Sequence, residues 1–476
     1  MNLLVSRKEK SNKKLGEGIK VPHTLVIISL IILFVSIATY IVPGGAYEKV
    51  VNEAGKTVVV DGSFKYVENQ PQGLFQVLQA PVQGIIDGAE IIAFLFIVGG
   101  AFNLISKTKA IDFGIVNIVN VFKGKEILII PIITFIFSLG GAVFGMSEES
   151  VPFVAILVPL MLVLGYDSIM AVGVTYLACN LGFSSAMLNP FTVGIAQSIA
   201  EIPMFSGIEY RTIIWFITTT VGTLFLMMYA TKIKKNPEFS PVYESDKIKR
   251  ENLTNFGEDK DGFTFTHKII LSLLALCIGI IVWGVLTQGF WIPQIAAVFL
   301  VTGLASGIIG RLSGDEMADA FIEGAKGMIG AAIMIGFARA IVIIAENASI
   351  IDTILYNLAG VIGKLPPLLA ACIMYPIQMF INFFVGSGSG QAALTMPILA
   401  PLGDLIGISR QLTVLIFQFG DGFSNVIFPT SGILIACLGI AGVPFGKWLK
   451  WVMPLQGILF VLAITFITIG SLIGWA

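Results

Sequence analysis

The chain has 476 residues, of which 56% are hydrophobic and only 12% are charged. A soluble domain carries about 25% charged residues, and a mean hydropathy of +0.89 is too high for a soluble protein of this length. The net charge of −1 provides no field that would attract nucleic acid. These values exclude a soluble enzyme, a nucleic-acid-binding protein and a disordered chain, and they indicate an all-α polytopic membrane protein.

The cysteines and histidines show no spacing typical of a site. Cys179, Cys277, Cys372 and Cys437 lie in separate apolar runs without a CxxC pair, which favours buried thiols over metal ligands or disulfides. Both histidines precede apolar runs, so we expect none inside the membrane. HExxH, G-x-S-x-G and P-loop motifs do not occur, which argues against an intramembrane enzyme and against ATP-driven transport. No cofactor is expected.

Apolar stretches of about 20 residues are long enough to cross a bilayer as helices. About nine such spans are predicted, at residues 22–42, 90–106, 168–200, 211–231, 269–287, 291–310, 327–345, 411–442 and 450–475. Helix-breaking residues inside 168–200 and 411–442 predict broken helices there. Two further apolar blocks, 127–164 and 366–406, are interrupted by small and polar residues, which is typical of re-entrant helical hairpins.

Basic residues in the loops set the orientation. The basic segment 1–21 predicts a cytoplasmic N-terminus before a first helix that is retained. Residues 43–90 carry three lysines against six acids and are predicted to be external. Residues 232–268 carry eight Lys/Arg and seven Asp/Glu, which predicts a cytoplasmic linker between two transmembrane repeats, 22–231 and 269–476. Nine spans then place the C-terminus outside.

The two halves repeat each other at a separation near 240 residues. The paired motifs are the tips at Gly145 and Gly386, the runs Ile156–Leu160 and Ile398–Leu402, and the Gly-Phe-Ser triplets at 182–184 and 422–424. The span count makes the second repeat inverted in the membrane relative to the first. Inverted repeats with broken helices are typical of secondary transporters that hold substrate near the midplane. The alternative is that the glycines only let helices pack closely.

The first hairpin tip carries Ser147, Glu148 and Glu149 between apolar arms. Burying two adjacent carboxylates in a membrane protein is costly, so such groups usually face a cavity and have a function. In the alternative reading, Ser147 caps the returning helix and both glutamates occupy its first turn, where the helix dipole favours acids.

The second tip provides hydroxyls and backbone N–H groups without charge, at Ser387, Ser389 and Gln391. Such a nest suits a substrate carboxylate or a coordinated cation. The broken helices add the candidate substrate and ion ligands Asn180, Ser184, Ser185, Asn189, Asp421, Ser424, Asn425, Thr430 and Ser431.

Three of these residues, Asn180, Asn189 and Asn425, stand close to breaks that free carbonyl groups, and they predict the place of a Na⁺ ion. No other metal is expected. Asp421 lies in an apolar run between two glycines, although an Asp-Gly turn in a loop is the alternative. Arg339 also lies in an apolar run. It is a candidate counter-ion for a carboxylate such as Asp421 or for a substrate carboxylate, and snorkelling to the interface is the alternative.

Four runs together resemble the YfcC family, which belongs with the DcuC-type C4-dicarboxylate carriers in the ion-transporter superfamily. The runs are 138–149, 182–190, 386–397 and 418–425, and the resemblance extends from Pro22 to the last span. It implies a multi-pass secondary carrier of the bacterial inner membrane with two inverted repeats and two re-entrant hairpins. It also implies an elevator motion and a homodimer.

The resemblance leaves the substrate open, because YfcC-like proteins are labelled basic amino-acid antiporters and DcuC-like proteins dicarboxylate carriers. Sodium-dicarboxylate members of the superfamily use Ser-Asn-Thr motifs at the tips, whereas 147–149 reads Ser-Glu-Glu here and 387–389 reads Ser-Gly-Ser. The carboxylates of Glu148, Glu149 and Asp421 would repel a divalent anion unless H⁺ or Na⁺ neutralised them.

The sequence therefore predicts a secondary transporter for amino acids, chiefly basic ones, by arginine/ornithine-type exchange. Coupling to H⁺ or Na⁺ stays open. An ion-coupled C4-dicarboxylate carrier is the alternative within the same class, and an ion channel is the alternative of another class.

Overall fold

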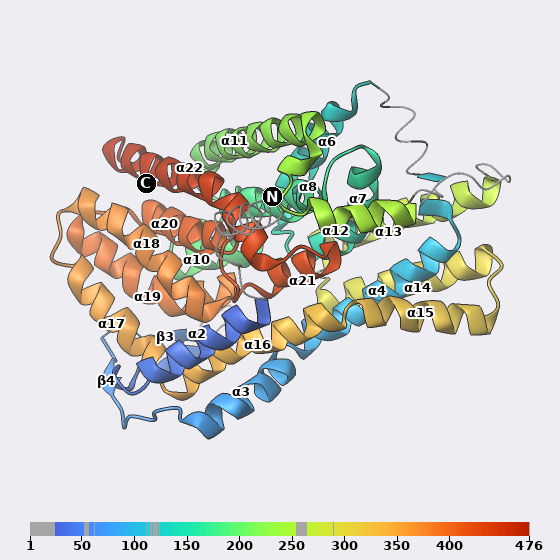
Figure 1. Ribbon diagram of the computed structural model, residues 1–476. Coiled ribbons are helices and arrows are strands. Elements are labelled where there is room, and N and C mark those ends of the chain that lie inside the picture. Colours follow the sequence, from blue (N-terminus) through green and yellow to red (C-terminus); the bar gives the residue numbers. More distant parts are fainter. Residues whose placement is uncertain are drawn as a thin grey trace, which may run out of the picture.

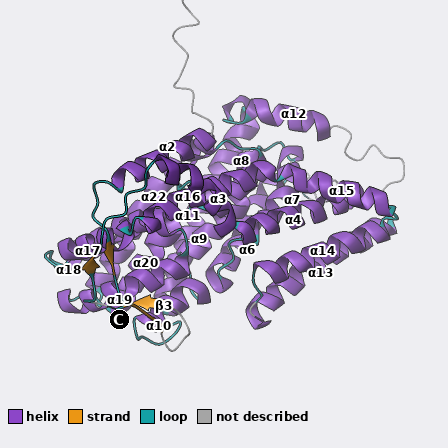
Figure 2. Cartoon of the chain, turned by 90° about the horizontal axis from the view of Figure 1, so that it is seen from below, coloured by secondary structure: helices purple, strands orange, loops and turns teal. Residues whose placement is uncertain are grey.

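The structure, a computed structural model, describes residues 24–51, 57–60, 62–111, 113–114, 117, 122, 124–253, 264–288 and 290–475. The predicted N-terminal segment, 1–21, and residues 254–263 of the linker lie outside the described residues. The described chain is helical apart from two short antiparallel strand pairs, as the composition predicts (Figures 1 and 2).

The helices follow the predicted order in both halves. The first half contains α2 (Thr24–Ala38), α3 (Leu74–Asp87), α4 (Ala89–Lys107), the 3₁₀ turn η1 (Glu126–Leu128), α6 (Ile129–Phe144), α7 (Ser150–Val163), α8 (Ser168–Val172), the π-helical turn η2 (Gly173–Leu177), α9 (Ala178–Ser184), the π-helical turn η3 (Pro190–Gly194), α10 (Ile195–Ile199) and α11 (Ile208–Lys235). The linker contains the 3₁₀ turn η4 (Pro237–Phe239) and α12 (Tyr243–Leu253).

The second half contains α13 (Phe265–Gln288), α14 (Ile292–Ile309), α15 (Gly314–Gly327), α16 (Ile329–Asn347), α17 (Ile350–Ile362), α18 (Pro367–Val385), α19 (Gly388–Ile406), α20 (Arg410–Ser424), α21 (Gly432–Ala441) and α22 (Phe445–Leu472). The strands are β1 (Gly45–Ala46), paired with β4 (Lys65–Tyr66), and β2 (Lys49–Val51), paired with β3 (Thr57–Val59). Strand β1 contacts α17. Strand β3 contacts α19, beside which it lies in Figure 2.

Element boundaries recur between the halves. Helices α3 and α15 begin at residues 74 and 314, and α4 and α16 begin at residues 89 and 329, a separation of 240 in both cases. Hairpin arms α6 and α18 both end at a left-handed glycine, Gly145 (φ 71°) and Gly386 (φ 56°). Glycine adopts this conformation without the steric cost that a side chain would bring. The two halves therefore share one order of elements and one kind of tip.

One layer of the molecule is built from α2, α3, α4, α13, α14, α15 and α16, and we call it the paired-helix layer (Figure 1). Within it α3 packs against α16 and α4 packs against α15. A Cβ at Gly84 would overlap the backbone of Gly336, and a Cβ at Gly324 would overlap the backbone of Gly99. Small residues thus let the backbones of the two halves approach closely in this layer.

This layer contains two helices that the sequence reading did not predict, α3 and α15. The external loop predicted at 43–90 contains α3, and the span predicted at 327–345 covers only the second part of a longer helix pair. Helices α15 and α16 together form that pair, which is bent by 41°. Gln76, Gln79 and Gln83 lower the hydropathy of α3. A hydropathy window therefore misses this helix, which is stabilised by packing against α16.

Most of the remaining helices, α6–α11 and α18–α22, form a second unit, which we call the hairpin body. Each predicted hairpin packs against a broken helix of its own half, α6 against α9 and α18 against α20. The two broken helices cross where Gly422 lies against Ser184, since a Cβ at residue 422 would come within 2.5 Å of the serine side chain. The breaks occur at residues 185–189 and 425–431, inside the stretches where they were predicted.

Among the described residues, six helices are long and apolar enough to cross a membrane, and the bent α15–α16 pair would add a seventh. The six are Ala89–Lys107, Glu126–Val143, Ile208–Lys235, Ile292–Ile309, Pro367–Val385 and Phe445–Leu472. Two of them are the first arms of the predicted hairpins. The count of nine spans and the re-entrant placement of the hairpins therefore stay predictions.

The linker helix α12 attaches the linker to the hairpin body. Asp246 is fully buried and accepts hydrogen bonds from the backbone N–H and the hydroxyl of Ser168, both at 2.7 Å. Lys249 Nζ donates to Asp246 Oδ1 and to the carbonyl of Ala441, also at 2.7 Å. In the other half, Arg410 Nη1 donates to the carbonyl of Ala200 at 2.8 Å. In each half, a carbonyl at the end of the broken helix thus accepts a hydrogen bond from a basic side chain.

We expect Lys249→Ala to lower the free energy of unfolding by about 1–3 kcal/mol, because it removes the cation paired with the buried carboxylate of Asp246 and takes the lysine's hydrogen bond from the Ala441 carbonyl. Lys247→Ala is the matched control, since Lys247 is exposed on the same helix. Thermal unfolding of the protein in detergent measures both variants. Equal stabilities for the two variants would contradict the role of Lys249.

Candidate functional site

A cavity of about 210 Å³ lies where the two hairpin tips and the two helix breaks meet the paired-helix layer. Its walls come from both halves of the chain, with α3, α4, α14 and α16 on one side and the hairpin body on the other. Pockets for drug-sized ligands are larger, about 300–1,000 Å³. The cavity therefore suits a small solute such as a single amino acid.

Ten of the sixteen predicted site residues line this cavity. They are Ser147, Glu148, Glu149, Asn180, Arg339, Ser387, Ser389, Asn425, Thr430 and Ser431. They come from elements that are far apart in sequence, as the repeated polar motifs predict.

The other six residues lie outside the lining: Ser184, Ser185, Asn189, Gln391, Asp421 and Ser424. The hydroxyls of Ser184, Ser185 and Ser424 donate to carbonyls one helical turn earlier, at 2.6 Å in each case. Gln391 Nε2 donates to the side chain of Gln378 at 2.6 Å. The serine contacts lie within one broken helix each, and the Gln391 contact joins α19 to α18, so these four side chains use their polar groups inside the hairpin body.

The cavity is strongly acidic. Asp87, Glu90, Glu148 and Glu149 contribute four carboxylates to its lining, against the single guanidinium of Arg339. Arg339 Nε lies 3.4 Å from Asp87 Oδ2, so the arginine pairs with the paired-helix layer and not with Asp421. The other three carboxylates form no ion pair in the part of the chain that the structure describes, which favours a positively charged solute.

At the first tip, Glu149 is the N-cap residue of α7 but does not cap the helix through its side chain, which bonds back to Ser147 instead. Glu149 Oε2 accepts a hydrogen bond from the backbone N–H of Ser147 at 3.0 Å, and the Ser147 carbonyl accepts one from the hydroxyl of Ser150. The carboxylate of Glu148 lines the cavity and forms no ion pair within the described residues. The two neighbouring glutamates therefore differ: Glu149 shapes the tip, and Glu148 offers its carboxylate to the cavity.

At the second tip, the side chain of Ser387 caps α19 by accepting from the backbone N–H of Gly390 at 3.4 Å. The hydroxyls of Ser387 and Ser389 lie 3.5 Å apart, and both residues line the cavity. This tip thus presents hydroxyl groups and the start of a helix, which can bind a carboxylate.

The three asparagines predicted to lie near a Na⁺ ion have hydrogen-bonding neighbours at their amide oxygens. The oxygen of Asn180 lies 3.3 Å from the hydroxyl of Ser184, and that of Asn189 accepts from the backbone N–H of Phe191 at 2.9 Å. The oxygen of Asn425 accepts from Asn382 at 2.8 Å. Nor do the described residues contain a group of three or more His, Cys, Asp or Glu that could hold a metal ion.

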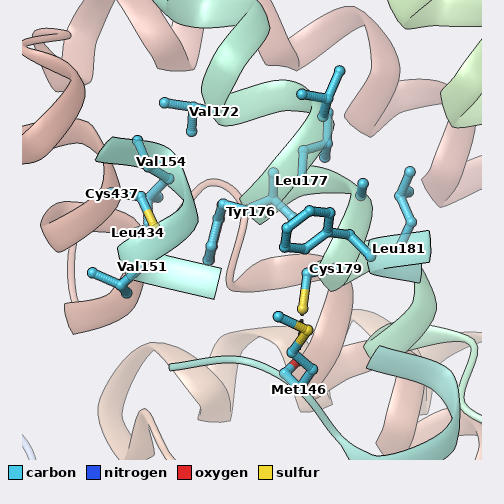
Figure 3. Close-up of a cluster of buried hydrophobic side chains, with 14 of the residues drawn as sticks. Met146, Val151, Val154, Val172, Tyr176, Leu177, Cys179, Leu181, Leu434 and Cys437 are labelled. Atoms are coloured by element: carbon cyan, nitrogen blue, oxygen red, sulfur yellow. Dashed lines mark hydrogen bonds between the residues drawn. The ribbon is translucent and has the colours of Figure 1, made fainter. Parts of the chain in front are cut away.

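A buried apolar cluster connects the first tip with the broken helices (Figure 3). Cys179 Sγ on α9 donates to the carbonyl of Met146, directly after the tip glycine, at 2.7 Å. Val151 of α7 and Cys437 of α21 belong to the same cluster. Cys179 and Cys437 are thus buried thiols, as predicted, and they pack the tip against the body.

Sequence reasoning missed several cavity residues, above all Asp87, Glu90, Tyr176 and Trp291. Asp87 and Glu90 fell at the edge of a segment read as an external loop. The repeat itself contained the missing signal, because a separation of 240 places residues 74–107 opposite 314–347, the segment that carries Arg339. Tyr176 donates to the carbonyl of Asn425 at 2.9 Å and so joins the two broken helices.

Comparison with known families identifies the chain. The model of the DcuC family, the C4-dicarboxylate anaerobic carriers, matches residues 21–472. The chain belongs to this family. It is therefore a multi-pass membrane transporter, and the family is one of transporters and not of enzymes.

Relatives of this DcuC-family chain include "Putative basic amino acid antiporter YfcC" of Escherichia coli K12, 42% identical over 95% of this chain and 97% of the relative. An uncharacterized protein of Haemophilus influenzae is 33% identical over 86% of this chain and 80% of the relative. Among solved structures, the Alcanivorax borkumensis YdaH transporter matches with 15% identity and a TM-score of 0.44, covering 95% of this chain and 99% of that one. Neisseria gonorrhoeae MtrF matches with 19% identity and a TM-score of 0.41, covering 95% and 96%.

Proposed function

We propose that this DcuC-family protein is a secondary transporter that exchanges basic amino acids of the arginine/ornithine type. The observation that carries the proposal is the charge of the cavity, where four carboxylates face one guanidinium. Asp87 neutralises that guanidinium, so a divalent anion would meet a net negative wall. The name of the YfcC relative, a basic amino-acid antiporter, supports the same substrate class.

Each end of a basic amino acid has a suitable partner in the cavity. Glu148 and Glu90 can bind the cationic side chain and the α-ammonium group through charge-assisted hydrogen bonds. The hydroxyls of Ser387 and Ser389, at the start of α19, can bind the α-carboxylate. Because arginine and ornithine carry the same charge, their exchange requires no net charge movement.

The position of the cavity supports an elevator mechanism. Its walls are divided between the paired-helix layer and the hairpin body, and the hairpin body contributes both tips and both breaks. A movement of the hairpin body along the layer would carry the substrate with the tips while exposing it to the opposite side. We also propose that the two repeats are inverted in a bacterial inner membrane with the N-terminus cytoplasmic. The homodimer stays a prediction.

Proteoliposomes loaded with ornithine test the function. We expect them to take up labelled arginine, and we expect liposomes without internal substrate to take up much less. Excess external lysine should compete with arginine, and succinate should not. Uptake of succinate or fumarate without arginine exchange would contradict the basic substrate and favour the C4-dicarboxylate carrier that the family description names.

A further inference from the structure

Arg211 is a buried cation without a counter-ion among the described residues. It lies in the first turn of α11, its exposed fraction is 1%, and its Nε and Nη1 atoms have no hydrogen-bond partner within that part of the chain. The remaining nitrogen, Nη2, donates to Gln411 Oε1 at 3.5 Å, which is a long hydrogen bond. A guanidinium stays protonated in proteins, and a buried charge is very costly unless an opposite charge compensates it. Arg211 therefore requires an anion.

The elements that pack against α11 provide no such anion. Helices α6, α9 and α22 contain no aspartate or glutamate. On α11 itself, Glu209 is exposed and forms no ion pair with Arg211 among the described residues. The 3₁₀ turns η1 and η4 contact the opposite end of α11, where Glu126 pairs with Lys234 at 3.1 Å. Glu238 lies in η4, directly after that end.

The acids beside α20 do not neutralise Arg211 either. Glu201 and Asp404 both pair with Arg410, the first residue of α20, at 2.9 and 2.8 Å. Asp421, the acid of α20 itself, lies in the last turn of that helix, at the end opposite to Gln411. No carboxylate of the described residues therefore compensates the charge of Arg211.

Two helix starts and one aromatic ring meet at this guanidinium. Gln411, the acceptor of Arg211, lies in the first turn of α20. The ring centroid of Trp475 lies 5.3 Å from Arg211 Cζ, and the Trp475 carbonyl accepts a hydrogen bond at 2.5 Å from Ser409, the N-cap residue of α20. The N–H groups of a first turn have no acceptor inside their helix, and the helix dipole makes this end positive. The starts of α11 and α20 therefore add to the positive potential around Arg211.

Neutral amides complete the surroundings of Arg211. Gln197 of α10 is fully buried, and its Nε2 donates to Gln411 Oε1 at 3.3 Å and to the Ser206 carbonyl at 3.0 Å. Gln411 Nε2 donates to the hydroxyl of Ser206. These hydrogen bonds orient the Gln411 oxygen toward Arg211, but an amide oxygen carries only a partial charge. They therefore leave the net charge of the guanidinium uncompensated.

We propose that Nε and Nη1 of Arg211 bind a small monovalent anion such as chloride at the starts of α11 and α20. Because Arg211 is fully buried, the site suits a single-atom halide better than a large organic anion. Arg211, Gln197, Gln411 and Trp475 do not line the solute cavity, so the anion site is separate from it. The site does not depend on the proposed exchange of basic amino acids.

Such an anion joins the two halves of the chain inside the hairpin body. Helix α11 belongs to the first half and α20 to the second, and the Arg211–Gln411 hydrogen bond connects them. On the linker side, the protein provides both charges itself, because Lys249 pairs with Asp246 at 2.7 Å and donates to the Ala441 carbonyl. At Arg211 the negative charge has to come from solution. Anion binding should therefore stabilise the folded protein by mass action.

The experiment measures the melting temperature of the purified full-length protein in detergent after exchange into sodium gluconate. Sodium chloride or sodium bromide then replaces the gluconate at constant Na⁺ concentration and pH, so that the ionic strength stays unchanged. We expect either halide to raise the melting temperature of the wild type by about 2 °C or more, with saturation at high concentration. Arg211→Gln should abolish this increase. Arg211→Lys keeps the charge in a different geometry and should need a several-fold higher halide concentration.

Lys235→Gln is the matched control, because it removes a positive charge from the exposed end of the same helix, and it should keep the wild-type response. Crystals of the wild type soaked in bromide provide a second measurement that needs no variant. We expect an anomalous peak within hydrogen-bonding distance of the Arg211 guanidinium. The proposal is overturned if the wild type melts at the same temperature in gluconate and in both halides, or if Arg211→Gln responds to halides as the wild type does. Absence of a bromide peak beside Arg211 overturns it as well.

Discussion

Glu148→Gln should reduce the apparent affinity for arginine by about 10- to 100-fold while the protein stays folded. A hydrogen bond to a charged group contributes about 1.5–3 kcal/mol, and about 1.4 kcal/mol corresponds to a tenfold change in affinity. Glu148 lines the cavity and its carboxylate forms no ion pair within the described residues, so its charge is available to a cationic solute. Arginine/ornithine exchange in proteoliposomes and binding by isothermal calorimetry measure the effect.

Glu149→Gln distinguishes the two neighbouring glutamates. The amide oxygen of the introduced glutamine can still accept the hydrogen bond from the backbone N–H of Ser147, so the tip should keep its shape. We therefore expect a smaller loss of affinity than for Glu148→Gln. Glu209→Gln, at an exposed site, should change neither affinity nor exchange. If Glu148→Gln binds arginine as tightly as the wild type does, the acidic cavity does not select the substrate.

Gly182→Ala should prevent the protein from folding into a stable form. Gly182 lies on α9 where it crosses hairpin arm α6, and a Cβ there would overlap the carbonyl group of Ser138. Because the overlapping atoms belong to the backbone, no side-chain rotation can relieve the clash. Overpacking lowers the free energy of unfolding by about 1–3 kcal/mol when side chains can adjust. Because the backbone atoms cannot adjust here, we expect a decrease at or above the upper end of that range. Fluorescence-detected size-exclusion chromatography of the membrane extract measures the folded fraction.

Gly457→Ala is the control for this substitution. Gly457 lies inside helix α22, and apart from its own helix backbone no heavy atom of the described residues lies within 4 Å of the place where its Cβ would be. Replacing glycine by alanine inside a helix favours the helix by up to about 1 kcal/mol, so this variant should be as stable as the wild type or slightly more so. A normal folded fraction for Gly182→Ala would show that α6 and α9 do not pack as closely as described.

Local features of the chain were predictable because they depend on neighbouring residues. Hydropathy located most long helices, and the glycines at 145 and 386 marked the tips, since a left-handed residue ends a helix wherever it occurs. The same reasoning missed α3, whose glutamines reduce its hydropathy and whose stability comes from packing against α16. Local sequence patterns predict a helix only when the residues of that helix stabilise it, and not when its stability comes from packing against another segment.

The sequence by itself determined that this is an all-helical membrane protein of the DcuC family, with repeated tips and breaks that carry polar residues. Only the tertiary structure decided which of those residues meet. It paired Arg339 with Asp87, brought Asp87 and Glu90 to the cavity, and left Asp421 outside the cavity lining. The physical reason is that hydropathy and helix caps act over a few residues, whereas the charge of a cavity depends on how segments hundreds of residues apart pack together.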